Sequence, residues 1–153
     1  MSQPEDSSDP MAQWRDLIGG FILAFGDIEL LTFRLWREHI GAELPPHNFK
    51  ERTGRVLSAL RKLGDNYPQV VSHLEASLRL ADKRNTIAHH PMQVQVFKHN
   101  TTGEYFLEHA ITSETNDDYI TDQDLKQLRA EAENLLVALY TALGYLERES
   151  LAV

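Results

Sequence analysis

The fold of this chain is decided by residues 67–96, which read YPQVVSHLEASLRLADKRNTIAHHPMQVQV. In the longer first part of that stretch, apolar residues recur at steps of four and three, which is the spacing of one helix face. Proline disfavours a helical conformation in the residue before it, so Pro91 is expected to end the helix. Val94 and Val96 then alternate with glutamines, and a period of two is typical of a strand. The stretch therefore predicts a helix followed by a β-hairpin over about 92–111.

Three further segments have the apolar spacing of amphipathic helices. They cover about 12–40, about 48–64 and a last stretch that begins at Thr121. Thr121 has Asp124 three residues later, which is close to a capping box, a pattern that starts a helix. Four helices with such seams and short connections predict an all-α fold. We expect an antiparallel four-helix bundle, with the β-hairpin inserted between the third and fourth helices.

The first helix is apolar on more than one side. Leu23 and Leu30 extend its apolar surface beyond the main face. A helix that is apolar on two sides is covered on two sides. In a chain this small, a partner subunit is a good candidate for the second contact.

The composition is that of one globular domain. The 153 residues are 42% apolar and 25% charged. Residues 1–10 are acidic and polar, so we expect a disordered tail followed by a single helical domain over 11–150. The absence of cysteine excludes disulfides, zinc–thiolate sites and a cysteine nucleophile. The start lacks a secretory signal, and the charge-free apolar runs are shorter than the roughly 20 residues of a membrane span, so we expect a cytoplasmic protein.

The net charge of −8 is concentrated in two segments. Residues 1–10 carry three acids and residues 114–124 carry five, without a lysine or arginine in either, so the rest of the chain is neutral. In the second predicted helix, Arg52, Arg55 and Lys62 predict a basic stripe that follows an RNA backbone. The alternative is the solvated outer face of a bundle helix. The acidic segment would repel RNA, so we expect it to lie away from an RNA-binding cleft.

The seven histidines do not form a metal-binding pattern. None belongs to an HxxxH or HExxH pair, and no Glu-x-x-His motif has a matching second half. His99 and His109 could meet across the hairpin as a metal site, with solvated histidines as the alternative. We expect no metal and no cofactor.

The candidate functional residues lie in the segment Lys83–Pro91, which reads KRNTIAHHP. Asn85 falls on the apolar seam, where a buried amide needs partners, and His89 follows one turn later on the same side. Asn85 is therefore expected to hold the ring of His89. Arg84 and His89 are five residues apart, about 140° around a helix, so only the length of Arg84 or a second chain brings both to one phosphate. A purely structural role for these polar residues is the alternative.

The pattern Arg84-Asn85-x-x-x-His89 resembles the RNxxxH motif of the HEPN superfamily of small helical-bundle domains. The resemblance extends over most of residues 12–148: a long first helix that carries Gly26-Asp27-Ile28-Glu29, the motif at the end of the third helix, and a final amphipathic helix. Many members of that superfamily are metal-independent endoribonucleases, often toxins or antiviral effectors. They commonly dimerise so that two motifs form one cleft, whereas other members are inactive and serve in binding or assembly.

This resemblance implies catalytic roles for Arg84, Asn85 and His89 in the cleavage of RNA through attack by its own 2′-OH. His89 would act as the acid or the base, since imidazole exchanges protons near neutral pH. Arg84 would stabilise the charge on the phosphorane oxygens. Asn85 would orient His89.

The resemblance also suggests supporting residues and partners. Asp27 or Glu29 would position Arg84, with solvated helix charges as the alternative. His90 would assist or merely cap the helix. We expect an RNA substrate, a homodimer through the first and third helices and, for a toxin, an antitoxin protein. The alternative function is a non-catalytic HEPN-like bundle that binds RNA, nucleotide or a partner protein.

Overall fold

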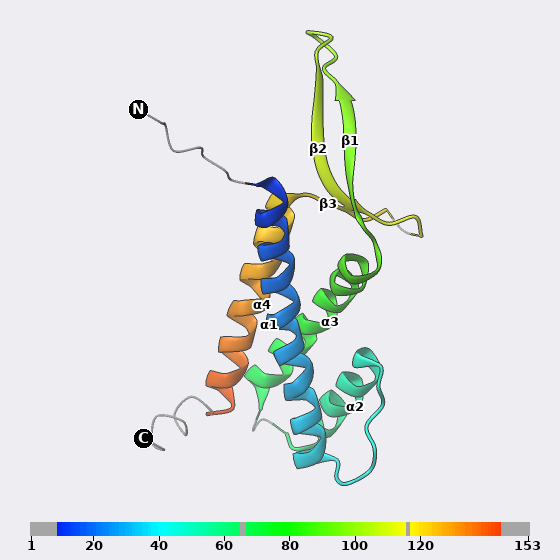
Figure 1. Cartoon of the computed structure of the whole chain (residues 1–153). Helices are drawn as coiled ribbons and strands as arrows, with labels where there is room; N and C mark the ends of the chain where they lie inside the picture. The colour runs from blue at the N-terminus through cyan, green and yellow to red at the C-terminus, as the bar shows by residue number, and fades with distance from the viewer. Residues whose placement is uncertain (1–8, 65–66, 116, 145–153) are drawn as a thin grey trace.

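The computed structural model describes residues 9–64, 67–115 and 117–144 (Figure 1). In these ranges the chain is mostly helical and carries one small antiparallel sheet, so the predicted helical fold with a β-hairpin is confirmed at that level. No helix of these ranges is long and apolar enough to cross a membrane. The elements, in chain order, are α1 (Pro10–His39), α2 (Phe49–Lys62), α3 (Pro68–His89), β1 (Met92–Lys98), β2 (Tyr105–Thr112), β3 (Tyr119–Ile120) and α4 (Asp122–Ala142).

The starts of α2 and α4 follow capping signals in the sequence. The predicted capping box at α4 is confirmed: the N–H of Asp124 donates to Oγ1 of Thr121 at 3.2 Å, and the N–H of Thr121 donates to the Asp124 carboxylate at 3.0 Å. Asn48 caps α2 by accepting from the N–H of Glu51 at 3.0 Å. These bonds satisfy backbone donors that have no partner inside a helix.

The start of α1 lies inside the segment 1–10 that the sequence assigns to a tail. Asp9 caps the helix by accepting from the N–H of Met11 at 3.0 Å, and Pro10 takes an opening position, where a missing N–H costs nothing. The other tail residues, 1–8, and residues 145–150 at the end of the predicted domain lie outside the described residues.

The core is built around α1. Phe21, Phe25, Ile28 and Leu35 are fully buried, and the other three helices pack against this helix. Burial of such side chains contributes roughly 1.5–3 kcal/mol each. The predicted apolar seam of α4 is confirmed by its buried residues Leu125, Leu128, Ala132, Leu135 and Leu139.

The buried face of α3 differs from the predicted one. The predicted seam had a period of 3.5 residues, which drifts by about 20° per seven residues relative to a straight helix. That drift does not account for the difference, because the buried face is displaced by one position: Val70, Ser77 and Ile87 are buried, whereas Asn85 and Ala88 are exposed. The prediction that Asn85 is a buried amide is therefore wrong. The residues that α3 buries are Val70, Leu74, Ser77, Leu80, Ala81, Thr86 and Ile87.

The helices α1 and α4 lie side by side and run in the same direction, whereas α3 runs the opposite way (Figure 1). The antiparallel order expected of a simple bundle therefore does not hold for this pair, because α3 runs opposite to α1 and the chain then turns back through the strands into α4. Gly20 leaves room for the side chain of Arg129, whose guanidinium lies where a Cβ at this position would stand. Arg129 donates from Nη1 to Asp16 at 3.0 Å and so joins α4 to α1.

The predicted β-hairpin is confirmed, and a short third strand extends it. β1 and β2 pair antiparallel as far as Lys98 opposite Tyr105, and Gly103 in the turn has a φ of 71°, which glycine adopts without strain. β3 pairs Ile120 with Ile111 and was not predicted, because two residues carry no periodic signal. The outer part of the hairpin, residues 94–109, projects beyond the helices in Figure 1, and we call it the hairpin arm.

Candidate functional site

Arg84 lies on the inner side of α3, where it faces α1. Its Nη2 is 3.1 Å from Oε1 of Glu29, and the two side chains are 27% and 28% exposed. The guanidinium also lies 5.2 Å from the ring centroid of Phe25. Its Nε–H is buried and has no hydrogen-bond partner among the described residues. Of the two acids predicted to position Arg84, Glu29 is the one that contacts it, whereas Asp27 is exposed.

Arg52 is fully buried, so its prediction as a member of an exposed basic stripe is wrong. It donates from Nε to Oγ1 of Thr32 at 2.8 Å, and from Nη1 to the carbonyls of Pro46 and His47 at 2.9 and 3.1 Å. Its guanidinium lies 3.7 Å from the ring centroid of Phe33. The stripe prediction failed because the loop before α2 offers carbonyl oxygens that only the tertiary structure brings to this side chain.

Arg52 also interacts with the Arg84–Glu29 pair. Burial lowers the pKa of the Arg52 guanidinium; the charge of Glu29 opposes that shift, and the charge of Arg84 adds to it. One carboxylate thus balances two cations from two other helices. We call Arg52, Glu29 and Arg84 the inner cluster, which joins α1, α2 and α3.

His89 lies on the outer side of α3, at an open hollow of about 540 Å³. Asn85 and His90 line the hollow from the helix end, and Asp118 lines it from the loop before β3. Arg84 is not among the lining residues. One chain by itself therefore does not bring Arg84 and His89 into a common cleft, in agreement with the angle of about 140° between them.

The imidazole that is held in place is that of His90. Its Nδ1 lies 3.0 Å from the carbonyl oxygen of Thr86. Because a carbonyl only accepts, this bond places a proton on Nδ1 and leaves Nε2, 3.4 Å from Oγ of Ser113, to exchange protons. The exposed Asn85 makes no hydrogen bond to His89 within the described part of the chain, so the expected orienting contact is absent.

Asp118 ties the acidic loop to the outer side of α3. Its two carboxylate oxygens accept from Nζ of Lys83 and from the hydroxyl of Thr86, each at 2.7 Å. The bond from Lys83, followed by the one from Thr86, lowers the pKa of the Asp118 carboxyl, and the charge of His90 adds to this shift. Since Asp118 lines the same hollow as His89, the expectation that the acidic segment lies away from the site is wrong.

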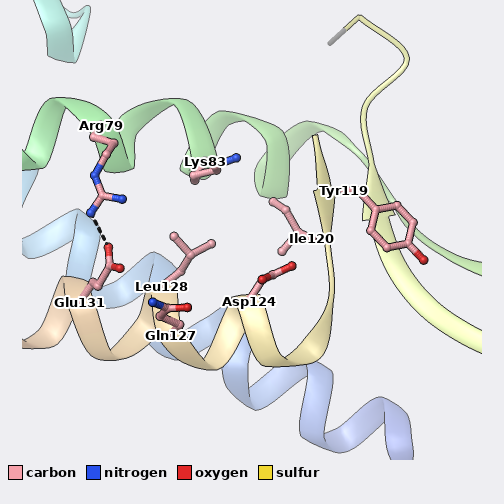
Figure 2. A pocket seen from close by; sticks show the side chains of 8 residues that line it. All are labelled: Arg79, Lys83, Tyr119, Ile120, Asp124, Gln127, Leu128 and Glu131. Atoms are coloured by element: carbon pink, nitrogen blue, oxygen red, sulfur yellow. Dashed lines mark hydrogen bonds and ion pairs between the residues drawn. The ribbon is translucent and has the colours of Figure 1, made fainter. Parts of the chain in front are cut away.

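A second hollow, of about 250 Å³, lies between α3 and α4. Figure 2 shows Arg79 of α3 reaching Glu131 of α4, to which it donates at 2.7 Å. Lys83 and Asp124 also line this hollow, so its acids and bases balance. The balance gives an RNA backbone no excess of cations, and we leave this hollow out of the candidate site.

Arg55 and Lys62 share a shallow depression of about 620 Å³ at α2 and the end of α1. Lys50 lines it as well, but it pairs with Asp82 of α3, and Arg55 pairs with Glu51 at 3.2 Å. These pairs reduce the positive field of the depression. Of the predicted basic stripe, Arg55 and Lys62 remain a candidate contact for a phosphate backbone.

The two hairpin histidines do not meet across the strands. The register pairs His109 with Val94, whereas His99 lies at the turn, where its backbone N–H donates to the carbonyl of Glu104 at 2.8 Å. This separation removes the pair as a candidate metal site. The described residues form no group of three or more histidines, aspartates or glutamates able to hold a metal ion.

No family model, no curated protein and no solved structure matches this chain. The candidate site therefore depends on its own geometry, with the inner cluster on one side of α3 and the two imidazoles on the other. The sequence interpretation missed Lys83, Thr86 and Asp118 as parts of the outer side. A signal was present, because Lys83 and Thr86 are hydrogen-bond donors three residues apart, outside the predicted seam, and such neighbours share one side of a helix.

Proposed function

We propose that this chain is a metal-independent endoribonuclease of the HEPN type. In this proposal the helices form a HEPN-like four-helix bundle, in which α3 runs opposite to both α1 and α4. The observation that supports it most strongly is the end of α3. There His89 and His90 stand at an open hollow little more than one turn beyond Arg84, and Glu29 holds Arg84 on the inner side.

The proposed reaction needs two proton transfers and no metal ion. A neutral imidazole accepts the proton of the 2′-OH while the 2′-oxygen attacks the adjacent phosphorus. An imidazolium donates a proton to the 5′-oxygen as the bond between that oxygen and phosphorus breaks. The products are a 2′,3′-cyclic phosphate and a 5′-hydroxyl.

We assign one of these transfers to His89 and regard His90 as a group that assists it. His89 is exposed at the hollow and stands in the last turn of α3. The bond from Nδ1 of His90 to Thr86 fixes the ring, so its Nε2 has a defined direction. Asn85 lines the same hollow and is available to the substrate.

Arg84 would stabilise the phosphorane. In one chain it does not share a cleft with His89, so a second chain would supply the histidine. A guanidinium is suited to this role because it stays charged and offers several donors in one plane. Its side chain keeps 27% of its surface exposed. A homodimer through α1 and α3 would place Arg84 of one protomer near His89 of its partner. A toxin or antiviral effector of this kind would be held inactive by an antitoxin protein.

A non-catalytic helical bundle is the second candidate, and Asp118 is the observation that favours it. A carboxylate beside the two imidazoles repels an RNA phosphate. The pairing of Arg84 with Glu29 is also what a purely structural arginine shows. In that case the hollow would bind a partner protein in an antitoxin or assembly role, or a nucleotide.

Incubation of the full chain with total RNA in EDTA tests the proposal. We expect fragments that end in a 2′,3′-cyclic phosphate. His89→Ala should lower the cleavage rate by about 100-fold or more, because a general acid or base is lost. His99→Ala is the matched control: it also removes an exposed histidine, from the turn of the hairpin, and should leave the rate unchanged.

Circular dichroism and urea unfolding establish that each variant is folded. A well-folded wild type that cleaves none of several RNAs would contradict the proposal and favour the non-catalytic bundle. Equal loss of cleavage in His89→Ala and His99→Ala would contradict the assignment of His89. Cleavage that requires a divalent metal would contradict the proposed chemistry.

A further inference from the structure

One face of the hairpin arm carries four exposed apolar side chains, with His109 and Lys98 as its polar members. Residues opposite each other in an antiparallel pair share a face of the sheet, and the register places Val94, Val96, Tyr105 and Leu107 on the same face. These four side chains are between 52% and 71% exposed. We call them the apolar arm face. Lys98 extends the same face, opposite Tyr105.

The apolar arm face continues a buried face of the sheet. At the base of the hairpin its next pair is Met92 and Ile111, and Ile111 is buried in the core. The opposite face carries Gln93, Gln95 and Glu108 near its base and the stacked rings of Phe97 and Phe106 nearer the turn. These two rings are 37% and 43% exposed, less than the side chains of the apolar arm face.

No described element of this chain covers the apolar arm face. In Figure 1 the arm projects past the ends of α1 and α3 without a helix beside its outer half. A two-stranded hairpin is marginally stable in water unless something packs against it. The face therefore fits a contact with another molecule.

A second uncovered apolar surface lies on α1, and its charge is complementary. Leu23 and Leu30 are 73% and 66% exposed, and seven residues of separation place them on one side of the helix. The exposed Asp27 lies between them and forms no ion pair within the described ranges. We call Leu23, Asp27 and Leu30 the α1 patch. The two leucines of the α1 patch can pack against the apolar arm face, and the carboxylate of Asp27 can pair with the ammonium of Lys98.

We propose that the hairpin arm of one protomer lies on the α1 patch of a second copy of this chain, and that the second copy returns the same contact. The α1 patch begins 13 residues after the start of α1 and ends 20 residues after it, which is about 20–30 Å along the helix axis from its first residue. The arm strands have seven and eight residues, or about 25 Å. In a two-fold pair with α1 helices antiparallel, each arm therefore reaches the patch of the other protomer.

A specific interface buries about 1,000 Å² or more in total, so each of the two reciprocal contacts needs about 500 Å² counted over both partners. The arm begins where α3 ends, so the reciprocal contact of the two arms brings both copies of His89 toward the two-fold axis. The inference does not rest on RNA cleavage, because its test measures mass.

Sedimentation velocity of the full chain at micromolar concentrations tests the inference. We expect a dimer in the wild type and a shift to monomer in both Leu107→Arg and Leu23→Arg. Gln95→Arg is the matched control, because it places the same side chain on the opposite face of the arm and should leave the dimer intact. Leu23 and Leu107 are exposed and Gln95 is half-buried, so none of the three changes touches the core and the variants are expected to fold.

Exchanging the charges of Asp27 and Lys98 tests where the arm binds on the second copy. Asp27→Lys and Lys98→Glu should each weaken the dimer by about tenfold, and the double variant should restore it, because the two charges again attract. A monomeric wild type would overturn the inference. So would a dimer that depends on Leu107 but not on Leu23, which places arm against arm, or a charge exchange without recovery.

Discussion

The two sides of the last turns of α3 differ in their surroundings. On the inner side, Arg84 meets Glu29 and Phe25 under the cover of α1. On the outer side, His89 is exposed at a hollow that a loop carboxylate, Asp118, shares. The two residues of one short motif thus stand in a packed environment and an open one.

This difference shows that the spacing between Arg84 and His89 gives the two residues different roles. Five residues correspond to about 140° around a helix, so one end of the motif faces the core when the other faces solvent. Changes to the inner cluster are therefore expected to reduce stability, whereas changes on the outer side are expected to affect reactivity with smaller effects on stability. The three predictions below test that separation.

The largest expected effect is the loss of the buried arginine of the inner cluster. Arg52→Ala should lower the free energy of unfolding by about 3 kcal/mol, because it leaves a cavity beside Phe33 and removes the donor to the carbonyls of Pro46 and His47. Urea unfolding measures the change. The control Arg55→Ala removes an exposed arginine from the same helix and should change stability by less than about 0.5 kcal/mol. Similar losses in both variants would contradict the burial of Arg52.

Removal of the acid of the inner cluster should have a smaller effect. Glu29→Gln keeps the size of the side chain but leaves Arg84 and Arg52 without the charge that balances them, and we expect a loss of about 2 kcal/mol. Glu43→Gln makes the same change of charge at an exposed position just after α1 and should cost less than about 0.5 kcal/mol. Thermal or urea unfolding of the two variants measures both losses, and a loss in Glu43→Gln as large as that in Glu29→Gln would contradict the role of Glu29.

The smallest effect is expected on the outer side, and it depends on pH. Asp118→Asn should cost about 1 kcal/mol at neutral pH, since it removes the charge that Lys83 and Thr86 stabilise. Folding lowers the pKa of the Asp118 carboxyl, so this stabilisation is present above the ordinary carboxyl pKa and is lost as the pH falls through the lowered value. The difference between wild type and variant should therefore shrink below about pH 4.

Urea unfolding at neutral and acidic pH measures that difference for Asp118→Asn. Asp117→Asn changes the adjacent, exposed carboxylate and serves as the control with little effect at either pH. A stability gap that stays constant or widens in acid would show that the bonds to Lys83 and Thr86 do not carry the effect.

Most of the secondary structure could be predicted, because it depends on residues close together in the chain. Pro91 separates α3 from β1, and Thr121 with Asp124 starts α4, as expected from their local chemistry. The angle between Arg84 and His89 followed from helix geometry alone. The exposure of Asn85 did not follow, because the helices packed against α3 bury the face one position away, which includes Ser77 and Ile87.

The sequence by itself thus determined the helices, the hairpin and the spacing of the motif, since capping, proline and periodicity act over a few residues. Only the tertiary structure decided that Arg52 is buried, that Glu29 and not Asp27 meets Arg84, and that Asp118 stands beside the imidazoles. These outcomes depend on partners 20 to 55 positions away, such as Thr32 for Arg52 and Glu29 for Arg84. A charged side chain is buried only where distant elements bring it hydrogen-bond partners and an opposite charge, and periodicity along one helix carries no information about them.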